Sequence, residues 1–223
     1  MTLPEWKLPP GVARGTWDYA NSTLVAEDYD DYHALNPLFE FEESILAEEF
    51  NPPGVVADFG CGTGRALVPL VRRGCRGIAV DLSEKMLAIV REKAGLEGLA
   101  IECVQANLVE LDALASESAD YGMCLFSTLG MIRGRKNRAA ALAHMRRVLR
   151  PGGRVIVPTF CHDETRISWL VSRLLAVTGF PGHRRFTVQS LNGALEDAGL
   201  AMDLSESLPG LIPIGYAQGR RPA

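Results

Sequence analysis

The sequence lacks a long hydrophobic run: no segment of its 223 residues approaches the roughly 18 consecutive apolar residues that a membrane-spanning helix needs. Its first residues also lack the basic stretch and apolar core of a secretory signal. It has no excess of positive charge, because 23 Lys and Arg stand against 27 Asp and Glu, whereas nucleic-acid-binding proteins usually carry a basic field. We therefore expect a soluble, cytoplasmic protein that neither spans a membrane nor binds nucleic acid.

The cysteines do not form recognisable pairs. There are five of them, an odd number, they lie far apart in the chain, and no C-x-x-C pair occurs. This pattern argues against both a disulfide framework and a zinc site. We expect no metal, and we expect small buried thiols at Cys61, Cys75, Cys103, Cys124 and Cys161.

The N-terminal part differs in pattern from the rest of the chain. Residues 1–17 are rich in proline and glycine, which predicts an extended arm. In residues 18–50 the apolar side chains recur at helical spacing, which predicts a short helical cap. The chain length fits one α/β domain, in which we expect the arm and cap over 1–50 and the main body over 51–223.

After residue 54, short apolar runs alternate with amphipathic stretches. The runs predict strands at 55–59, 76–81, 100–105, 120–126 and 154–160, and the stretches predict helices at 64–73, 83–94 and 135–149. Ser83 is expected to cap the start of helix 83–94, and Gly95 its end. Alternation of this kind is typical of a parallel sheet with helices on both faces.

The C-terminal part predicts an amphipathic helix at 164–178, a second helix at 187–198 and two strands at 200–207 and 211–218. A Pro-Gly pair at 209–210 separates these strands, which indicates a hairpin at the sheet edge. The expected fold is therefore Rossmann-like α/β, with a seven-stranded, mostly parallel sheet, a C-terminal antiparallel hairpin and an N-terminal helical cap.

The first predicted strand ends in a glycine-rich turn that leads directly into a helix. Few side chains cover such a turn, so a ligand can approach the backbone N–H groups and the positive helix end. Gly60, Gly62 and Gly64 follow G-x-G-x-G spacing, whereas dinucleotide-binding turns use G-x-G-x-x-G. The carboxylate of Asp58, two residues before the first glycine, would repel a pyrophosphate but suits a cationic amine.

Residues 56–64 resemble the first motif of the class I S-adenosylmethionine-dependent methyltransferases, and residues 148–154 resemble that family's turn into its fifth strand. The resemblance covers 54–160 by motifs and 187–218 by topology. It implies an enzyme that uses S-adenosyl-L-methionine and releases S-adenosyl-L-homocysteine. It also implies that Asp58 orients the cofactor's ammonium group and that the turn passes under the methionine part through Gly60, Cys61, Gly62, Thr63 and Gly64.

Further cofactor contacts are expected at the ends of the next two strands. Asp81 ends strand 76–81, where a carboxylate can accept hydrogen bonds from both ribose hydroxyls, a group that NAD enzymes need as well. By the resemblance, Leu82 and Met86 flank the adenine, although Met86 could equally be a core residue. Asn107 stands where the family commonly has an Asp that contacts the adenine amino group, and an amide oxygen still accepts that bond. Asp112 is an alternative, and Asn107 could instead simply close a turn.

The remaining predicted cofactor contacts lie in the cap and after two strands. Leu108 follows Asn107, and Phe126 lies at the carboxyl end of strand 120–126, beside the transferred methyl group in the family. Tyr19 and Tyr29 could place aromatic rings or hydroxyls near the sulfonium or the cofactor carboxylate. The alternative is that these rings pack the cap onto the sheet.

Methyl transfer from a sulfonium needs proximity, alignment and a dry pocket more than it needs a catalytic side chain. If the acceptor must first lose a proton, the candidate bases are His162, His33 and Glu164, of which His162 lies at the ligand-binding end of strand 154–160. The alternative for His162 is an exposed residue beside a helix cap. No Asn/Asp-Pro-Pro-Tyr/Phe tetrapeptide occurs, which makes planar amides and exocyclic amines less favoured acceptors.

The acceptor class follows from weaker signals. The apolar stretch 167–177 could wall an acceptor pocket, touch a membrane surface, or pack into the core. The basic residues around helix 135–149 favour a solvated face, not an RNA-binding surface. We expect a small-molecule, lipid-like or quinone-like acceptor and a monomer or homodimer. The alternatives are a nucleic-acid or protein methyltransferase and a non-catalytic or NAD-type cofactor-binding protein.

Overall fold

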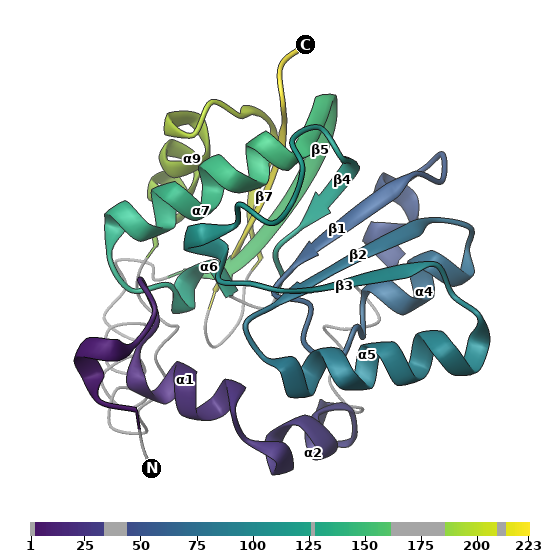
Figure 1. Ribbon diagram of the computed structural model, residues 1–223. Helices are drawn as coiled ribbons and strands as arrows, with labels where there is room; N and C mark the ends of the chain where they lie inside the picture. The colour runs from purple at the N-terminus through teal and green to yellow at the C-terminus, as the bar shows by residue number, and fades with distance from the viewer. Residues whose placement is uncertain (1–2, 34–43, 126–127, 162–185, 209–212) are drawn as a thin grey trace.

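The computed structural model describes residues 3–33, 44–125, 128–161, 186–208 and 213–223 (Figure 1). In this part of the chain, seven strands form one sheet in the order β3-β2-β1-β4-β5-β7-β6. Five strands run parallel: β1 (Val55–Phe59), β2 (Arg76–Asp81), β3 (Ile101–Gln105), β4 (Ala119–Met123) and β5 (Leu149–Phe160). The last two, β6 (Ala201–Leu208) and β7 (Ile214–Arg220), are antiparallel. The predicted fold class is confirmed.

Helices cover both faces of the sheet (Figure 1). One face packs against α4 (Leu67–Arg72), α5 (Glu84–Glu97) and the helical residues 44–49. The other packs against α7 (Arg135–Val148) and α9 (Val188–Asp197). Neighbouring residues of a strand point to opposite faces, so Val56 belongs to the first core and Ala57 to the second. This double burial explains why the parallel strands appear in the sequence as short continuous apolar runs.

Several element ends differ from the prediction. Ser83 caps α5 as expected, but Gly95 lies inside the helix, and Gly98 ends it with φ +66°, a left-handed conformation that glycine adopts without strain. The strand predicted at 154–160 begins already at Leu149, because the β4–β5 pairing shifts register and lets residues 150–153 bulge from the ladder. The predicted helix 164–178 and the turn at 209–210 lie outside the described residues.

The C-terminal hairpin follows the prediction closely. Thr187 begins α9 with a capping box, in which its hydroxyl accepts from the Ser190 N–H and the Ser190 hydroxyl accepts from the Thr187 N–H. Strand β7 then inserts between β5 and β6, so the last strand in the chain is interior and β6 forms the edge.

The prediction of an extended arm over 1–17 is wrong in part. A short 3₁₀ turn, η1 (Glu5–Lys7), is followed by α1 (Arg14–Ala20), which starts within the proposed arm, and then by α2 (Thr23–His33). The turn before α1 is held by tertiary contacts, since the Gly11 carbonyl accepts from the Arg133 N–H at 2.7 Å. Such contacts outweigh the low helix propensity of Gly15, which lies inside α1.

Candidate active site

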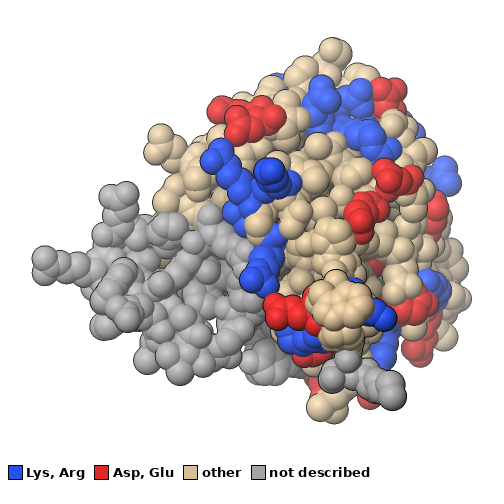
Figure 2. Space-filling model, turned by 60° about the vertical axis from the view of Figure 1, so that its left-hand side comes forward, with Lys and Arg blue, Asp and Glu red and all other residues tan. Residues whose placement is uncertain are grey.

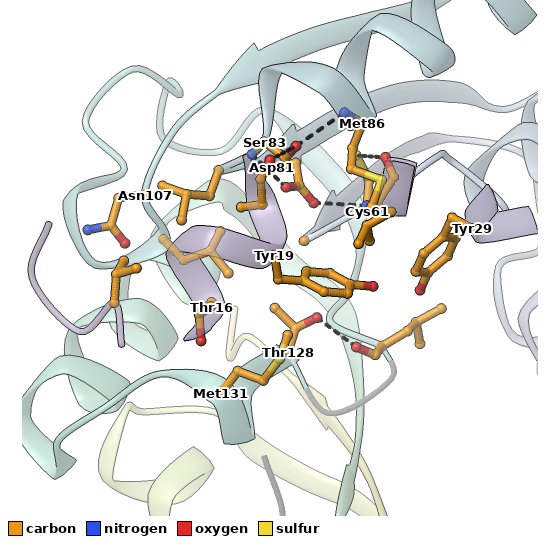
Figure 3. A pocket seen from close by; sticks show the side chains of 18 of the residues that line it. Thr16, Tyr19, Tyr29, Cys61, Asp81, Ser83, Met86, Asn107, Thr128 and Met131 are labelled. Atoms are coloured by element: carbon orange, nitrogen blue, oxygen red, sulfur yellow. Dashed lines mark hydrogen bonds between the residues drawn. The ribbon is translucent and has the colours of Figure 1, made fainter. Parts of the chain in front are cut away.

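A cavity of about 580 Å³ lies where the carboxyl ends of the parallel strands meet the N-terminal helices (Figure 3). Its described wall comes from the glycine turn after β1, the end of β2, the segment after β3, the start of α6 (Thr128–Met131), and α1 and α2. Ligands of open α/β sheets bind at this edge. The cavity is therefore the candidate site.

The glycine turn has the backbone conformation that its spacing predicts. Gly60 and Gly62 line the cavity with φ of +89° and +54°, and a Cβ on Gly60 would lie 2.5 Å from Thr128 Cγ2. Gly64 also has a positive φ, but a Cβ there would meet Val90 Cγ2 at 3.1 Å, so this glycine serves packing on α5. Gly62 lies under the ring of Tyr29, whose Cε1 is 3.8 Å from the ideal Cβ position of the glycine.

Asp81 ends β2 at the cavity wall, and its carboxylate is held by two backbone N–H groups. Gly62 donates to Oδ2 at 2.9 Å, and Ser83 donates to Oδ1 at 2.8 Å. Burial raises the pKa of this carboxyl above its ordinary value, and the hydrogen bonds from the Ser83 and Gly62 backbones oppose the shift. An ionised carboxylate has about four lone-pair sites, so each oxygen can still accept a bond from a ligand hydroxyl.

Asp58 is buried near the end of β1 and contributes to the cavity wall together with Cys61. Burial, together with the charge of Asp58, raises the pKa of the Cys124 thiol to about 12 and that of Cys61 well above its ordinary value. Both thiols therefore remain neutral. All five cysteines are free, and all except the half-buried Cys103 are buried, as predicted.

Two tyrosines of the cap reach into the cavity (Figure 3). Tyr19 comes from α1, and burial followed by the charge of Asp81 raises its pKa to about 12, so it stays a neutral phenol. Tyr29 comes from α2, and the hydroxyls of the two rings point toward the same part of the cavity. Leu82, Met86, Asn107 and Leu108 also line it, as the sequence predicts.

Asn107 has a structural role whether or not it binds a ligand. Its Oδ1 accepts from the Val109 N–H at 3.2 Å and so caps the 3₁₀ turn η2 (Leu108–Glu110), while its Nδ2 donates to the Pro10 carbonyl at 2.9 Å. The turn-closing alternative is thus observed. Asp112 is exposed and does not line the cavity.

Thr63 is in the glycine turn but is absent from the cavity wall. It is fully buried, and its hydroxyl donates to Asp30 Oδ1 at 2.6 Å, while Lys93 Nζ approaches Asp30 Oδ2 at 2.5 Å. Thr63 therefore connects the turn to α2.

The comparison with known proteins agrees with this geometry. A family model described as a methyltransferase domain matches residues 56–153. A demethylmenaquinone methyltransferase of Thermus thermophilus is 32% identical over 147 residues, which are 61% of this chain and 64% of that protein. A ubiquinone biosynthesis O-methyltransferase of Hahella chejuensis is 26% identical over 160 residues, which are 71% of this chain and 62% of that protein. The chain thus spans less than two thirds of the length of either relative.

Residues 56–153 of the chain are thus similar to a methyltransferase domain, as the sequence motifs predict. A solved structure with the same fold is the 1,6-didemethyltoxoflavin-N1-methyltransferase of Burkholderia thailandensis with bound S-adenosylhomocysteine. It is 21% identical, covers 97% of this chain and 93% of its own, and has a TM-score of 0.73.

The cavity suits a ligand that has a diol, an ammonium, a sulfonium and a carboxylate, the groups of the cofactor that the sequence resemblance implies. Three carboxylates line its described wall, Asp28, Asp58 and Asp81, which fits two cationic groups and a diol. Arg65 is the one positively charged side chain among the described lining residues, and it follows the glycine turn directly. The charges of the wall therefore complement those of the cofactor.

Some of the predicted site residues are not described. Phe126, His162 and Glu164 lie outside the described residues, and His33 is the last residue of α2, with its side chain likewise outside the description. Within the described residues, no cluster of three metal-ligating side chains occurs, and no helix is long and apolar enough to cross a membrane.

Part of the cavity wall was not predicted from the sequence. The largest such group lies in the supposed arm and in α1 and α2, and the others lie directly after the glycine turn and in or just after α6; they include Gly11, Val12, Thr16, Leu24, Val25, Arg65, Thr128, Met131 and Ile132. Val12, Thr16, Tyr19 and Ala20 recur at helical spacing, a signal that could have placed one face of α1 on the cavity.

Proposed function

We propose that this protein is a class I methyltransferase that transfers the methyl group of S-adenosyl-L-methionine to a small apolar acceptor bound beneath the N-terminal helices. The proposal rests on the separation of charged and apolar residues in the cavity wall. Two carboxylates, Asp58 and Asp81, lie at the strand ends, whereas many of the other described lining residues are apolar. The apolar group includes Val12, Leu24, Val25, Leu125, Met131 and Ile132.

In this proposal the charged residues orient the cofactor. Asp81 accepts from the two ribose hydroxyls, Asp58 faces the ammonium, and Arg65 pairs with the carboxylate of the methionine part. Leu82, Met86 and Leu108 enclose the adenine, and Asn107 accepts from its amino group through the second lone pair of Oδ1. Thr63 and Gly64 act indirectly, through the cap and through packing on α5.

The cofactor, when bound, supplies a methyl group on a positively charged sulfur, so the protein has only to align the acceptor in line and exclude water. The helices α1 and α2 close the cavity over the strand ends and perform that exclusion. Tyr19 and Tyr29 place hydroxyls and ring faces where the sulfonium would lie, and the ring faces favour its positive charge. His162 and His33 stay predictions as bases for an acceptor that must lose a proton.

The relatives support an apolar acceptor. The names of two of them refer to ubiquinone biosynthesis and demethylmenaquinone. A quinone-like or other flat, largely apolar molecule would match the lining described above.

The surface around α7 gives no support for a nucleic-acid acceptor. Three arginines of this helix are engaged within the protein: Arg138 bonds the Ile132 carbonyl at 3.1 Å, Arg146 the Gly199 carbonyl at 3.0 Å, and Arg147 the carbonyls of Leu111 and Leu114 at 2.7 Å each. Figure 2 shows acidic side chains among the basic ones on this face. A duplex-binding surface would instead present a continuous basic field.

The test combines binding and turnover. Calorimetry should detect binding of S-adenosylhomocysteine and none of NAD, and the reverse result would overturn the proposal. Methyl-labelled cofactor is then incubated with the protein and separate extracts of small molecules, lipids, RNA and proteins. Label in a low-molecular-weight or lipid fraction supports the proposal, whereas label only in RNA or protein would contradict it.

A further inference from the structure

The mouth of the cavity lies at α1 and α2. Of the described residues that line the cavity, four are exposed, and all four belong to these two helices: Gly15, Tyr19, Leu24 and Asp28. The other described lining residues are buried or half-buried. If the cofactor occupies the strand ends, an acceptor enters past α1 and α2 and contacts these exposed residues.

Asp28 is the one charged residue among these four. It follows Leu24 by four residues and Val25 by three, so it shares one face of α2 with two apolar side chains that also line the cavity. Leu24 is 69% exposed, and Tyr19, on α1, is 40% exposed. The mouth therefore presents a single carboxylate on an otherwise apolar rim.

The carboxylate of Asp28 has no cationic partner among the described residues, whereas two other carboxylates of the cap do. Asp30 is paired with Lys93 at 2.5 Å, and Asp18 lies 4.0 Å from Arg14. Neither Asp30 nor Asp18 lines the cavity. The unpaired charge of Asp28 is thus available to a ligand at the mouth.

The proposed cofactor contacts leave Asp28 without a counterpart. In that arrangement Asp81 accepts from the ribose hydroxyls, Asp58 faces the ammonium, and Arg65 pairs with the carboxylate. With three carboxylates and one arginine, the described wall has an excess of negative charge. A cleft lined mainly by one sign of charge attracts ligands of the opposite sign.

We infer that the acceptor carries a positively charged group, such as a protonated amine, which binds Asp28 at the mouth while the apolar body of the acceptor lies inside the cavity. This inference rests on the proposed function and names the class of its acceptor. Among flat, largely apolar molecules, it selects those that bear a basic nitrogen. A neutral quinone would leave the carboxylate of Asp28 without an opposite charge.

The charge of the acceptor tests the inference directly. Methyl-labelled S-adenosyl-L-methionine is incubated with the protein and extracts of small molecules and lipids, and the acceptor is identified from the mass of the labelled product. The isolated acceptor should be retained by a cation exchanger at pH 7. An acceptor without a positive charge would overturn the inference and leave the proposed function intact. If no small molecule or lipid became labelled, the proposed function itself would fail.

Kinetics of Asp28→Asn test the residue, because this change keeps the shape of the side chain and removes its charge. It should raise the KM for the acceptor by about three- to tenfold, the scale for losing one charge-assisted bond at a partly open site, and change the KM for S-adenosyl-L-methionine by less. The matched control is Asp31→Asn, which removes an exposed carboxylate of α2 that does not line the cavity. Equal KM values for the acceptor in the two variants, or a rise in the KM for the cofactor alone, would overturn the inference.

Discussion

Asp30 of α2 accepts a hydrogen bond from the hydroxyl of Thr63 in the glycine turn, at 2.6 Å. The same carboxylate accepts from Lys93 of α5 at 2.5 Å, so one side chain of the cap contacts both the cofactor turn and the helix behind it. Stability of the cap and order of the cofactor turn should therefore depend on each other.

Replacing Asp30 tests this dependence. Asp30→Ala should reduce the free energy of unfolding by about 1–2 kcal/mol, since the pair with Lys93 is only partly buried. It should also speed dissociation of S-adenosylhomocysteine in stopped-flow experiments. The control is Asp31→Ala, which removes an exposed carboxylate from the next position. Equal dissociation rates in the two variants would contradict the proposed coupling.

Removing the ionised form of Asp81 should weaken cofactor binding. Asp81→Asn is expected to cost about 1–3 kcal/mol of affinity for S-adenosylhomocysteine, the range for a buried bond to a charged group. Unchanged affinity in calorimetry would show that the ribose assignment is wrong.

The raised pKa of Asp81 also predicts a pH dependence. Because the proposed bonds from the ribose hydroxyls are stronger to the ionised carboxylate, affinity should fall as the pH is lowered, with a midpoint above 3.8, the ordinary value for this group. In the ligand-free protein, the contribution of Asp81 to the free energy of unfolding should change with pH in the opposite direction. A carboxyl whose pKa is raised on folding stabilises the protein below its ordinary pKa, and this stabilisation is lost as the pH rises through the folded pKa. In Asp81→Asn, the contribution of this residue to the pH dependence of affinity, measured by calorimetry, and to that of stability, measured by denaturant unfolding, should both disappear.

The proposed pairing of Arg65 with the cofactor carboxylate can be tested by comparing two ligands. Arg65→Gln should weaken binding of S-adenosylhomocysteine, which has a carboxylate, by about tenfold or more, and leave binding of 5′-methylthioadenosine, which lacks the amino-acid part, unchanged. Arg76→Gln, at the opposite end of β2, is the charge-matched control. Equal weakening of both ligands by Arg65→Gln would refute the carboxylate assignment.

Two glycines should respond oppositely to the same substitution. Gly60→Ala places a Cβ 2.5 Å from Thr128 at φ +89° and should destabilise the protein by about 2–4 kcal/mol, with loss of cofactor binding. Gly95→Ala lies inside α5 with no atom within 4 Å of the new Cβ, and should stabilise it by about 0.5–1 kcal/mol. Denaturant unfolding of the two variants distinguishes a glycine that the turn requires from one that the helix tolerates.

The parts of the fold that depend on local sequence could be predicted. Strands β1 and β2 have the predicted bounds, because each is a short apolar run delimited by polar residues or by glycine and proline. The end of α5 was misplaced since the sequence offers both Gly95 and Gly98, and local pattern does not decide which becomes left-handed. Helix α1 was missed because it is held by contacts to residues distant in the chain, such as Asn107 and Ser83.

The residues of the candidate site also differ in whether they could be predicted from local sequence. Asp58, Asp81 and the glycine turn could be predicted because the chemistry follows directly from strand ends and glycine spacing. Thr16 and Arg65 could not, since an isolated Thr or Arg is common on any surface, and only the fold brings them to the cavity. The hydrogen bond of Thr63 with Asp30 could not be predicted either, because Asp30 belongs to another helix.

The interior position of β7 has a consequence for synthesis of the protein. Strand β5 pairs with β7 from Arg154 with Arg220 to Phe160 with Ile214, so its outer edge is covered by a strand that is synthesised long after it. Until β7 has been synthesised and has paired, β5 presents a long unpaired edge, which is a template for association with other chains. Truncations that remove β7 should therefore aggregate even though they retain the described residues that line the cavity.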